Sequence, residues 1–275
     1  SGRVRAGLAT DGVDVLGRHV YQASLLWRIT GPAAAVDGLH TARPDWAAGY
    51  VYDRWRAAFF AGASDTTSFR PVAAPGGLAR PDAELREQEA RAGVALSVRH
   101  VRHAQVFQSA FALERNTLTT TGASGAFRRH SLQTAWAFNS AKLYGRSISP
   151  EDGLAVAVTS EQVRAAFGAD GDADAYTAEL RGYRRIGDHH SVLALRAGAG
   201  VATGDLSVRR RFYLGGSSPA GALVNFGSDA LRMLRGFDDT VFAGSRIAVV
   251  NVEWRRQAWR IERGFGTFPV FLRTI

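Results

Sequence analysis

Two short runs contain residue types that bind ligands in other proteins. Residues 170–174 read Asp-Gly-Asp-Ala-Asp and begin like a calcium loop, but Ala175 stands where that loop needs glycine and Arg181 where it needs a bidentate glutamate. Gly198-Ala199-Gly200 follows an apolar stretch as a dinucleotide-binding turn does, but Thr203 replaces the third glycine and no helical pattern follows. We therefore expect a solvated loop at the first run and a glycine-rich strand end at the second.

Two histidine pairs, His100 with His103 and His189 with His190, are the other candidate metal ligands. Both pairs fall at predicted turns, where exposed polar residues are common. The chain has no cysteine, which excludes a disulfide and a thiolate-ligated zinc or iron–sulfur centre. It also lacks the short motifs of serine hydrolases, zinc proteases and phosphate-binding loops. We expect no catalytic residue, no cofactor and no metal, and therefore no enzyme.

A third pattern, in a long polar segment near the C-terminus, predicts an ion pair. Arg211-Phe212-Tyr213-Leu214-Gly215-Gly216 is followed by Leu234-Arg235-Gly236-Phe237. Gly236 permits a tight backbone turn after Arg235, and a guanidinium enclosed by protein needs a carboxylate within hydrogen-bonding reach, which Glu253 could supply. An ordinary surface turn in an arginine-rich chain is the alternative. The candidate residues for such a contact are Arg235, Gly236, Phe237 and Glu253, with Gly215 and Gly216 as loop glycines.

The elements that must position these residues are β-strands. In residues 89–99 every second residue is Ala, Val or Leu, and the residues between are charged or small. The segments 20–29, 129–139, 176–183 and 246–255 show the same period of two, which is typical of strands with unlike faces. The pattern predicts about eleven strands, at 3–10, 16–29, 46–61, 88–99, 103–115, 128–140, 152–160, 174–185, 190–202, 244–255 and 267–275.

The polar faces of these strands favour a membrane barrel over a soluble barrel or sandwich. Glu179 shares one polar face with Arg181, and Asn251, Glu253 and Arg255 share another, so these five residues are expected to face a wet or ion-paired lumen. Aromatic residues near strand ends suggest the girdles of a membrane barrel. Tight turns near 100–102 and 186–190, expected on the periplasmic side, alternate with long polar loops. The predicted long loops are 65–86, 163–172 and 203–239, the last one extracellular and folded into the lumen.

The charge and the hydropathy of the chain agree with this interpretation. The formal net charge is +9, and Lys142 is the only lysine. Because a soluble nucleic-acid binder usually mixes lysine with arginine, we place the arginines in a lumen and its turns and expect no nucleic-acid partner. The apolar runs are shorter than the ~20 residues that a membrane helix needs, whereas transmembrane strands need only about 9–11 alternating residues.

We expect residues 1–275 to form one domain, an incomplete barrel. Met233 is the only methionine, and no signal peptide is visible at Ser1. Eleven is an odd number of strands, whereas bacterial single-chain barrels close with an even number. The last strand candidate ends without the terminal aromatic residue of a complete barrel. These features predict a piece of a longer protein, cut at its C-terminus and also at its N-terminus.

The segment 203–275 resembles the C-terminal barrel of the bacterial surface-antigen family, the superfamily of BamA-, TamA- and FhaC-like outer-membrane assembly and secretion barrels. The resemblance rests on Tyr213-Leu214-Gly215-Gly216, on Arg235-Gly236-Phe237 and on Glu253 of the following strand. It implies a sixteen-stranded antiparallel barrel, of which this chain holds about eleven strands. It also implies that the loop lies in the lumen, where Arg235 is held by Glu253 and forms a latch with Gly236 and Phe237. A second acidic partner, in a Phe-x-Asp-x-Gly motif, is expected beyond the end of the sequence.

The function expected from this resemblance is assembly, insertion or translocation of polypeptides at the bacterial outer membrane. Outer-membrane lipid is the expected surrounding, and client polypeptides or periplasmic assembly factors are the expected partners. Two other functions stay open. One is a passive pore or a membrane anchor for a fused periplasmic or surface module, and the other is a soluble ligand-binding β-barrel.

Overall fold

The strands form wherever apolar and polar residues alternate, because a β-strand points successive side chains to opposite faces. In β9 (Ala173–Arg185), for example, Tyr176 and Leu180 are exposed on one face, while Glu179 is buried on the other. A computed structural model describes residues 4–30, 43–73, 79–120, 123–144, 149–187, 191–215 and 242–256, with positions 147, 224, 226, 231, 234, 236–237, 264–265 and 268–271.

Within the described residues, eleven strands form a single antiparallel sheet. Each strand pairs with its neighbours in sequence order, except that β10 pairs with β13 across the long loop. The prediction of an all-β, antiparallel and incomplete barrel is therefore confirmed. Besides β9, its strands are β1 (Val4–Val13), β2 (His19–Thr30), β3 (Asp45–Tyr52), β4 (Ala57–Ala73), β5 (Ala79–Arg99), β6 (Ala104–Thr120), β7 (Ala123–Asn139), β8 (Gly153–Val163), β10 (Val192–Gly204) and β13 (Arg246–Arg255).

Few other elements occur in the described part of the chain. A single 3-10 turn, η1 (Ala165–Phe167), lies between β8 and β9. Two short ribbons lie outside the large sheet: β11 (Phe212–Leu214) pairs with β12 (Phe242–Gly244), and β14 (Gly264–Phe265) pairs with β15 (Phe268–Phe271). Among the described residues, no helix has the length and hydrophobicity needed to cross a bilayer.

Three boundaries differ from the sequence-based expectation. The segment 46–61 is two strands rather than one, because the chain turns at 53–56. This turn contains neither glycine nor proline and apolar residues flank it on both sides, so the sequence pattern did not reveal it. The segment 65–86 is largely a continuation of β4 and β5 rather than a loop. Polar side chains of this segment form hydrogen bonds across the two strands. For example, Arg86 Nε donates to Asp65 Oδ1 at 2.8 Å. The predicted strand 267–275 includes β15, which lies outside the large sheet, and its last residues fall outside the described part.

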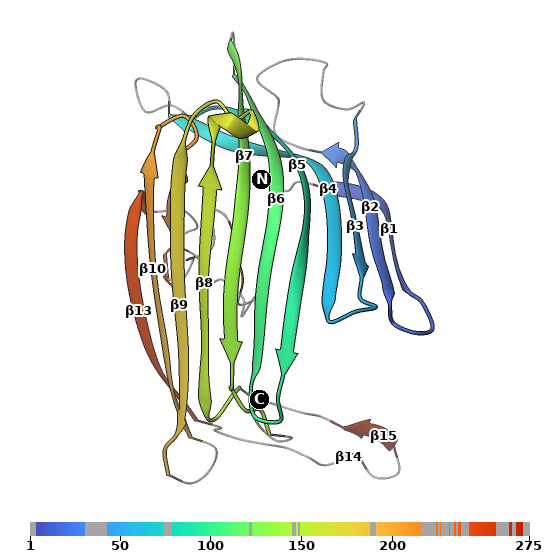
Figure 1. The fold of residues 1–275 in the computed structure, drawn as a ribbon, viewed down its shortest axis with the longest axis vertical. Coiled ribbons are helices and arrows are strands. Elements are labelled where there is room, and N and C mark those ends of the chain that lie inside the picture. Colours follow the sequence, from blue (N-terminus) through green and yellow to red (C-terminus); the bar gives the residue numbers. More distant parts are fainter. Residues whose placement is uncertain are drawn as a thin grey trace.

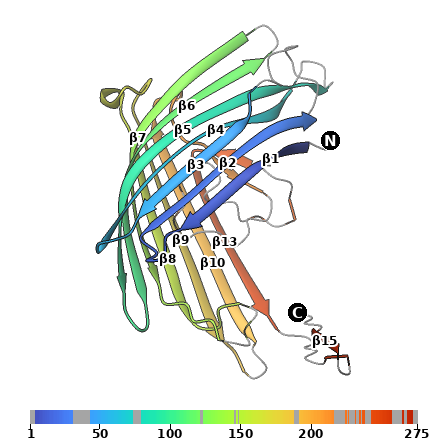
Figure 2. The same ribbon diagram turned by 90° about the vertical axis from the view of Figure 1, so that its right-hand side faces the viewer.

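The sheet curves into an open half-barrel with one concave and one convex face (Figures 1 and 2). Its edge strands within the described residues are β1 and β13. Strands β1, β3, β5, β7 and β9 run toward one end of the sheet, here called the turn end. Strands β6, β8 and β10 run toward the opposite end, the loop end, which is uppermost in Figure 1. Antiparallel order therefore places 100–102 and the described residues 186–187 opposite the start of the loop that follows β10.

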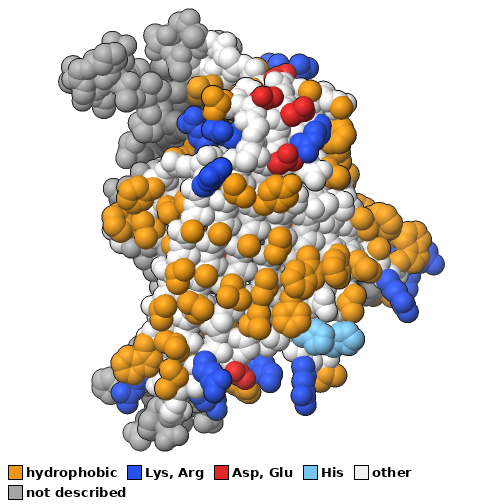
Figure 3. All heavy atoms as spheres, turned by 60° about the vertical axis from the view of Figure 1, so that its left-hand side comes forward, with side chains coloured by type: hydrophobic (Ala, Val, Ile, Leu, Met, Phe, Trp, Pro, Cys, Tyr) orange, Lys and Arg blue, Asp and Glu red, His pale blue; other side chains and the backbone are white. Residues whose placement is uncertain are grey.

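The convex face is apolar over a broad band. Figure 3 shows hydrophobic side chains across the middle of this face, with charged side chains gathered toward both ends. Large side chains on this face are exposed, among them Leu180, Val250 and Trp254. A monomer rarely exposes so large an apolar area to water. The convex face is thus suited to lipid, and the concave face carries the polar residues.

Candidate functional site

The site is built where the chain leaves β10 and turns back over the concave face. Gly204 adopts a φ of +100°, and a Cβ there would lie 2.3 Å from the carbonyl oxygen of Asp172. Glycine therefore lets the chain pass close to the β8–β9 connection. The backbone N–H of Asp172 then donates to the carboxylate of Asp205 at 2.8 Å, and Arg209 N donates to the carbonyl of Asp205 at 2.8 Å. These bonds form a tight turn that aims residues 206–212 at the sheet.

Two apolar side chains of the loop anchor it against the strands. Val208 is completely buried against Val163 of β8 and Ala173 of β9. Phe212 is buried with Leu231 against β9, β10 and β13. These contacts remove the loop's apolar residues from water and fix its position over the concave face.

Gly200 of β10 makes room for this packing. A Cβ at Gly200 would lie 2.8 Å from Leu231 Cδ1 and 3.1 Å from the ring of Phe212. Contacts that short force neighbouring atoms to move. The glycine-rich strand end predicted at 198–200 is thus the floor on which the loop rests.

Arg210 reaches from the loop to two carboxylates on the sheet. Its Nε donates to Glu161 Oε2 at 2.9 Å, and its Nη2 donates to Glu161 Oε1 at 2.6 Å and to Glu114 Oε1 at 3.2 Å. Two parallel bonds to one carboxylate are the strongest arrangement available to arginine. The guanidinium thus fixes the loop to β6 and β8 at once.

Arg129 of β7 completes the arrangement between the same two carboxylates. Its Nη1 donates to Glu114 Oε2 at 2.8 Å and its Nη2 to Glu161 Oε2 at 3.0 Å, while its Nε donates to the carbonyl oxygen of Val208 at 2.7 Å. The strand arginine therefore also holds the loop backbone. We call Glu114, Arg129, Glu161 and Arg210 the loop-anchor cluster.

The loop-anchor cluster is balanced in charge and largely hidden from water. The side chains of Arg129 and Glu161 are each 5% exposed, and those of Glu114 and Arg210 are 12% and 14% exposed. Ser131 and Gln133 also approach Glu161, at 3.4 and 3.3 Å. Two positive and two negative charges offset their desolvation only because nearly every polar atom has a partner.

The strand residues predicted to face the lumen lie on the concave face. Glu179 accepts from Arg181 Nε at 2.6 Å and from Arg196 Nε of β10 at 2.7 Å. Arg196 stands directly between Arg181 and Asn251 in the register of the three strands. One carboxylate thus holds two neighbouring guanidinium groups that would otherwise repel each other.

The predicted latch between Arg235 and Glu253 falls partly outside the described residues. Arg235 and Gly216 are not among them. Gly236 has a φ of +87°, as its predicted role in a tight turn requires, and the ring of Phe237 lies 6.0 Å from that of Phe242. Gly215 has a φ of +138°. Glu253 accepts from Arg255 Nε at 2.9 Å and from its Nη2 at 2.7 Å, on the same concave face.

Sequence reasoning missed all four members of the loop-anchor cluster. A weak signal exists, since three consecutive arginines, 209–211, directly precede Phe212. Glu161 lies one residue beyond the strand predicted at 152–160. Glu114 stands next to Arg115 within an otherwise ordinary strand, so neither carboxylate attracts attention before the strands are assembled.

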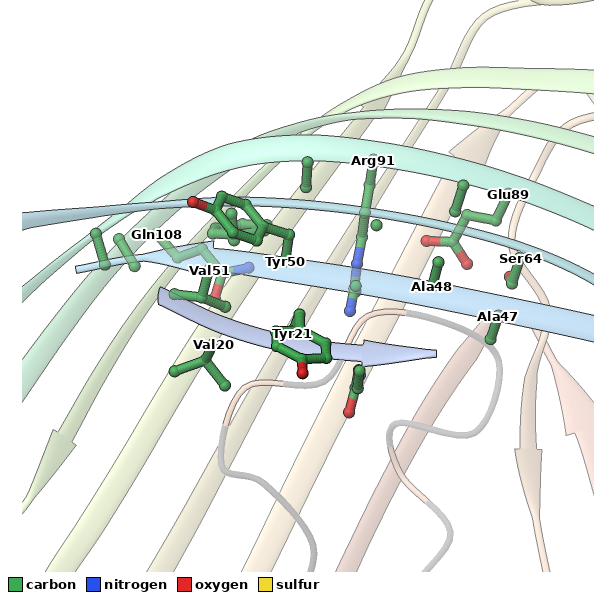
Figure 4. A pocket seen from close by; sticks show the side chains of 18 residues that line it. Val20, Tyr21, Ala47, Ala48, Tyr50, Val51, Ser64, Glu89, Arg91 and Gln108 are labelled. Carbon is green, nitrogen blue, oxygen red and sulfur yellow. The ribbon is translucent and has the colours of Figure 1, made fainter. Parts of the chain in front are cut away.

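Two cavities lie on the concave side. One, of about 380 Å³, lies between β5–β7 and the loop and is lined by Glu87, Arg129 and Arg210. The other, of about 630 Å³, lies over β2–β6, where Glu89 and Arg91 extend from the same face of β5 above a floor that includes Gly49 and Gly62 (Figure 4). The loop therefore covers one part of the concave face and leaves a polar space over another.

The carboxylates of the calcium-like run have protein donors. Arg128 donates to Asp170 from its backbone N at 2.8 Å and from its Nη2 at 2.9 Å, and Arg164 donates to Asp174 at 2.7 Å. The rings of His100 and His103 lie 4.7 Å apart at the turn end, and residues 188–190 are outside the described part. Among the described residues, no group of three acidic or histidine side chains could enclose a metal ion.

A comparison with known families supplies a match over most of the chain. The family model described as the Omp85 superfamily domain matches residues 52–267. This span runs from the last residue of β3 beyond β13 and contains the whole loop-anchor cluster. A search of curated proteins finds no match to the chain.

Proposed function

Because the chain belongs to the Omp85 superfamily, we propose that it inserts or translocates polypeptides at the bacterial outer membrane, acting as a transmembrane β-barrel domain. The apolar convex face suits a bilayer, and the polar concave face suits a hydrated interior. Client polypeptides and periplasmic assembly factors are the partners that this function requires.

The loop-anchor cluster is the observation that carries the proposal. A loop that only covers the outside of a barrel needs no buried charges, whereas Arg210 enters the concave side and bridges β6 and β8. A segment held inside a lumen blocks it until the segment moves. The loop after β10 is therefore proposed to act as a lumenal latch, held by Arg210 in addition to the predicted Arg235.

Charge pairing makes such a latch reversible. When Arg210 leaves, Arg129 still faces Glu114 and Glu161, so the strand side keeps one positive charge for two negative ones. Water that enters the cavity lined by Arg129 and Arg210 can then solvate the groups that are released. The ion pairs of the latch are thus strong while they are buried and weak once water reaches them, as a gate on a polypeptide path requires.

The proposal is tested with the full chain reconstituted in liposomes. The probe is a urea-unfolded, eight-stranded outer-membrane barrel, whose insertion is followed by its altered gel mobility without heating. We expect liposomes that hold the chain to insert the probe faster than empty liposomes. Arg210→Ala should change that rate, and Arg164→Ala, which removes a more exposed ion pair, should not.

The alternatives give different results in the same preparation. Ion conductance without faster insertion would indicate a passive pore, and neither effect would indicate a membrane anchor. A chain that stays in the aqueous phase without detergent would indicate a soluble barrel. Each of these outcomes contradicts the proposed function.

A further inference from the structure

The turn end carries four arginines without ion-pair partners in the described part of the chain. Three neighbouring connections, after β1, β3 and β5, hold Arg18, Arg54, Arg56 and Arg102, and all four are exposed. We call them the basic turn cluster. The same connections hold only two acidic residues, and one of these, Asp14, already accepts the backbone N–H groups of Arg18 and His19. The cluster therefore has a net positive charge and free donors.

Several arginines toward the loop end are paired within the protein. Arg86 pairs with Asp65, Arg128 with Asp170, and Arg164 with Asp174. Arg43 and Arg115 are exposed there without an ion-pair partner among the described residues, but one precedes β3 and the other lies on β6, so they are not on neighbouring strands. Unpaired arginines on neighbouring connections are thus a property of the turn end.

An aromatic row separates the basic turn cluster from the apolar band. His19 Nδ1 and the hydroxyl of Tyr50 lie 2.6 Å apart, and the ring of His19 lies 4.9 Å from that of Tyr52. Trp55 continues the row, with its ring 5.6 Å from Tyr52 and 5.8 Å from Phe59. Amphipathic rings of this kind lie at the level of lipid headgroups. The arginines are therefore at the depth of the phosphates.

A groove on the convex face leads away from this row into the apolar band. It has a volume of about 500 Å³, and small side chains of β3, β4 and β5 form its floor between Tyr50 and Phe111. Its floor includes Ala48, Ala61, Ala63, Ala90 and Ala92; we call it the alanine groove.

The spacing between groove and arginines matches one lipid leaflet. Arg56 lies five residues before Ala61, which is about 17 Å at ~3.3 Å per residue. A strand tilted by about 45° rises about 12 Å along the membrane normal over that distance. Half of a ~30 Å hydrocarbon core is about 15 Å, so an acyl chain spans from the cluster to the groove.

We propose that this surface binds an anionic phospholipid, with its phosphate on the basic turn cluster and one acyl chain in the alanine groove. Guanidinium groups form paired hydrogen bonds with phosphate oxygens. A free phosphate would use the arginines but not the groove. The continuity of charge, aromatic row and groove along the same strands therefore favours a lipid as the occupant.

The test uses the full chain in detergent with equal amounts of phosphatidylglycerol and phosphatidylcholine of identical acyl chains, and native mass spectrometry to count the lipids retained. We expect phosphatidylglycerol to be retained preferentially. Arg54→Gln with Arg56→Gln should weaken its binding about fivefold for each arginine removed. The matched control, Arg43→Gln with Arg115→Gln, removes two exposed arginines toward the loop end and should change it less than twofold.

The groove has its own variant and control. Ala61→Leu fills the alanine groove and should reduce retention of both lipids, whereas Ala178→Leu, on the convex face of β9, should not. Higher salt should lower the preference of the unmodified chain for phosphatidylglycerol. This measurement does not depend on whether a variant folds.

Three outcomes overturn the proposal. The first is equal retention of both lipids by the unmodified chain, and the second is an equal effect of the two arginine pairs. The third is displacement of phosphatidylglycerol by excess inorganic phosphate, which would indicate a phosphate site. The assay contains no polypeptide client, so its result does not depend on the proposed insertion function.

Discussion

Replacement of Arg210 by alanine is the sharpest test of the loop-anchor cluster. The change removes three hydrogen bonds of 2.6 to 3.2 Å to Glu161 and Glu114. Both carboxylates stay largely buried, but each retains Arg129, at 2.8 Å for Glu114 and 3.0 Å for Glu161. The substitution thus leaves two carboxylates for one guanidinium in a poorly hydrated space.

The expected magnitude follows from that imbalance. Removing one partner of a buried ion pair typically costs about 3–5 kcal/mol, because the remaining charge has lost its compensation. Arg129 and the weaker contacts from Ser131 and Gln133 still stabilise Glu161. We therefore expect Arg210→Ala to lower the free energy of unfolding by about 3 kcal/mol, the lower end of the range.

Urea unfolding in lipid bilayers measures the stability, and limited proteolysis measures the release of the loop after β10. Arg164→Ala is the control, because the Arg164–Asp174 pair is one-third exposed on both sides and such pairs contribute about 0–1 kcal/mol. Arg210→Lys should recover only part of the loss, since one ammonium group cannot form the paired bonds of a guanidinium.

A double-mutant cycle with Glu161→Ala separates the direct interaction from general disruption. Residues that share one ion-pair network show coupling of about 0.5–3 kcal/mol. The reasoning is refuted if Arg210→Ala costs no more than Arg164→Ala, if the cycle shows no coupling, or if the protease reaches the loop equally in both variants.

Three further predictions concern the floor of the loop, the lipid face and the response to acid. Gly200→Ala should cost about 1–3 kcal/mol and expose the loop to protease, whereas Gly182→Ala should do neither, because a Cβ there meets its nearest neighbour at 3.9 Å. Val250→Arg, on the convex face, should destabilise the barrel by about 2–4 kcal/mol in bilayer unfolding experiments, while Val101→Arg in an exposed turn should be neutral. A backbone N–H donated from β7 lowers the pKa of Asp170 below 3.8, so its contribution to stability is complete above that pH and is lost as the pH falls through the lowered value. Acid titration followed by proteolysis of the β8–β9 connection should show this loss, and Asp170→Asn should remove the pH dependence.

The alternating segments were predictable because a strand's period is local. The alternation within residues 89–99 and 246–255 predicts the two faces of each strand without reference to any other part of the chain. These segments lie in β5 and β13. The boundary between β3 and β4 was not predictable in this way. Its turn lacks glycine and proline, and the backbone hydrogen bond from Asp53 to Arg18 that accompanies it joins two separate turns.

The loop-anchor cluster shows what sequence reasoning could not reach. The motif at 234–237 drew attention to Arg235, because glycine after arginine is a recognisable local pattern. Arg210 has no such neighbour, and its role depends on Glu114 and Glu161, which are 96 and 49 residues away. A charge run can be read from the sequence, but the choice among its three arginines depends on where the loop turns at Gly204 and Asp205.

The sequence by itself determined the β class, the apolar and polar faces of most strands and the exclusion of thiolate chemistry, since each follows from residue types and their spacing over a few positions. Only the tertiary structure decided which charges meet. Strand register aligns Arg181, Arg196 and Asn251 across three strands, and the return of the loop brings Arg210 between β6 and β8. These contacts join residues far apart in the chain, so their energies depend on the folded arrangement and leave no local pattern to read.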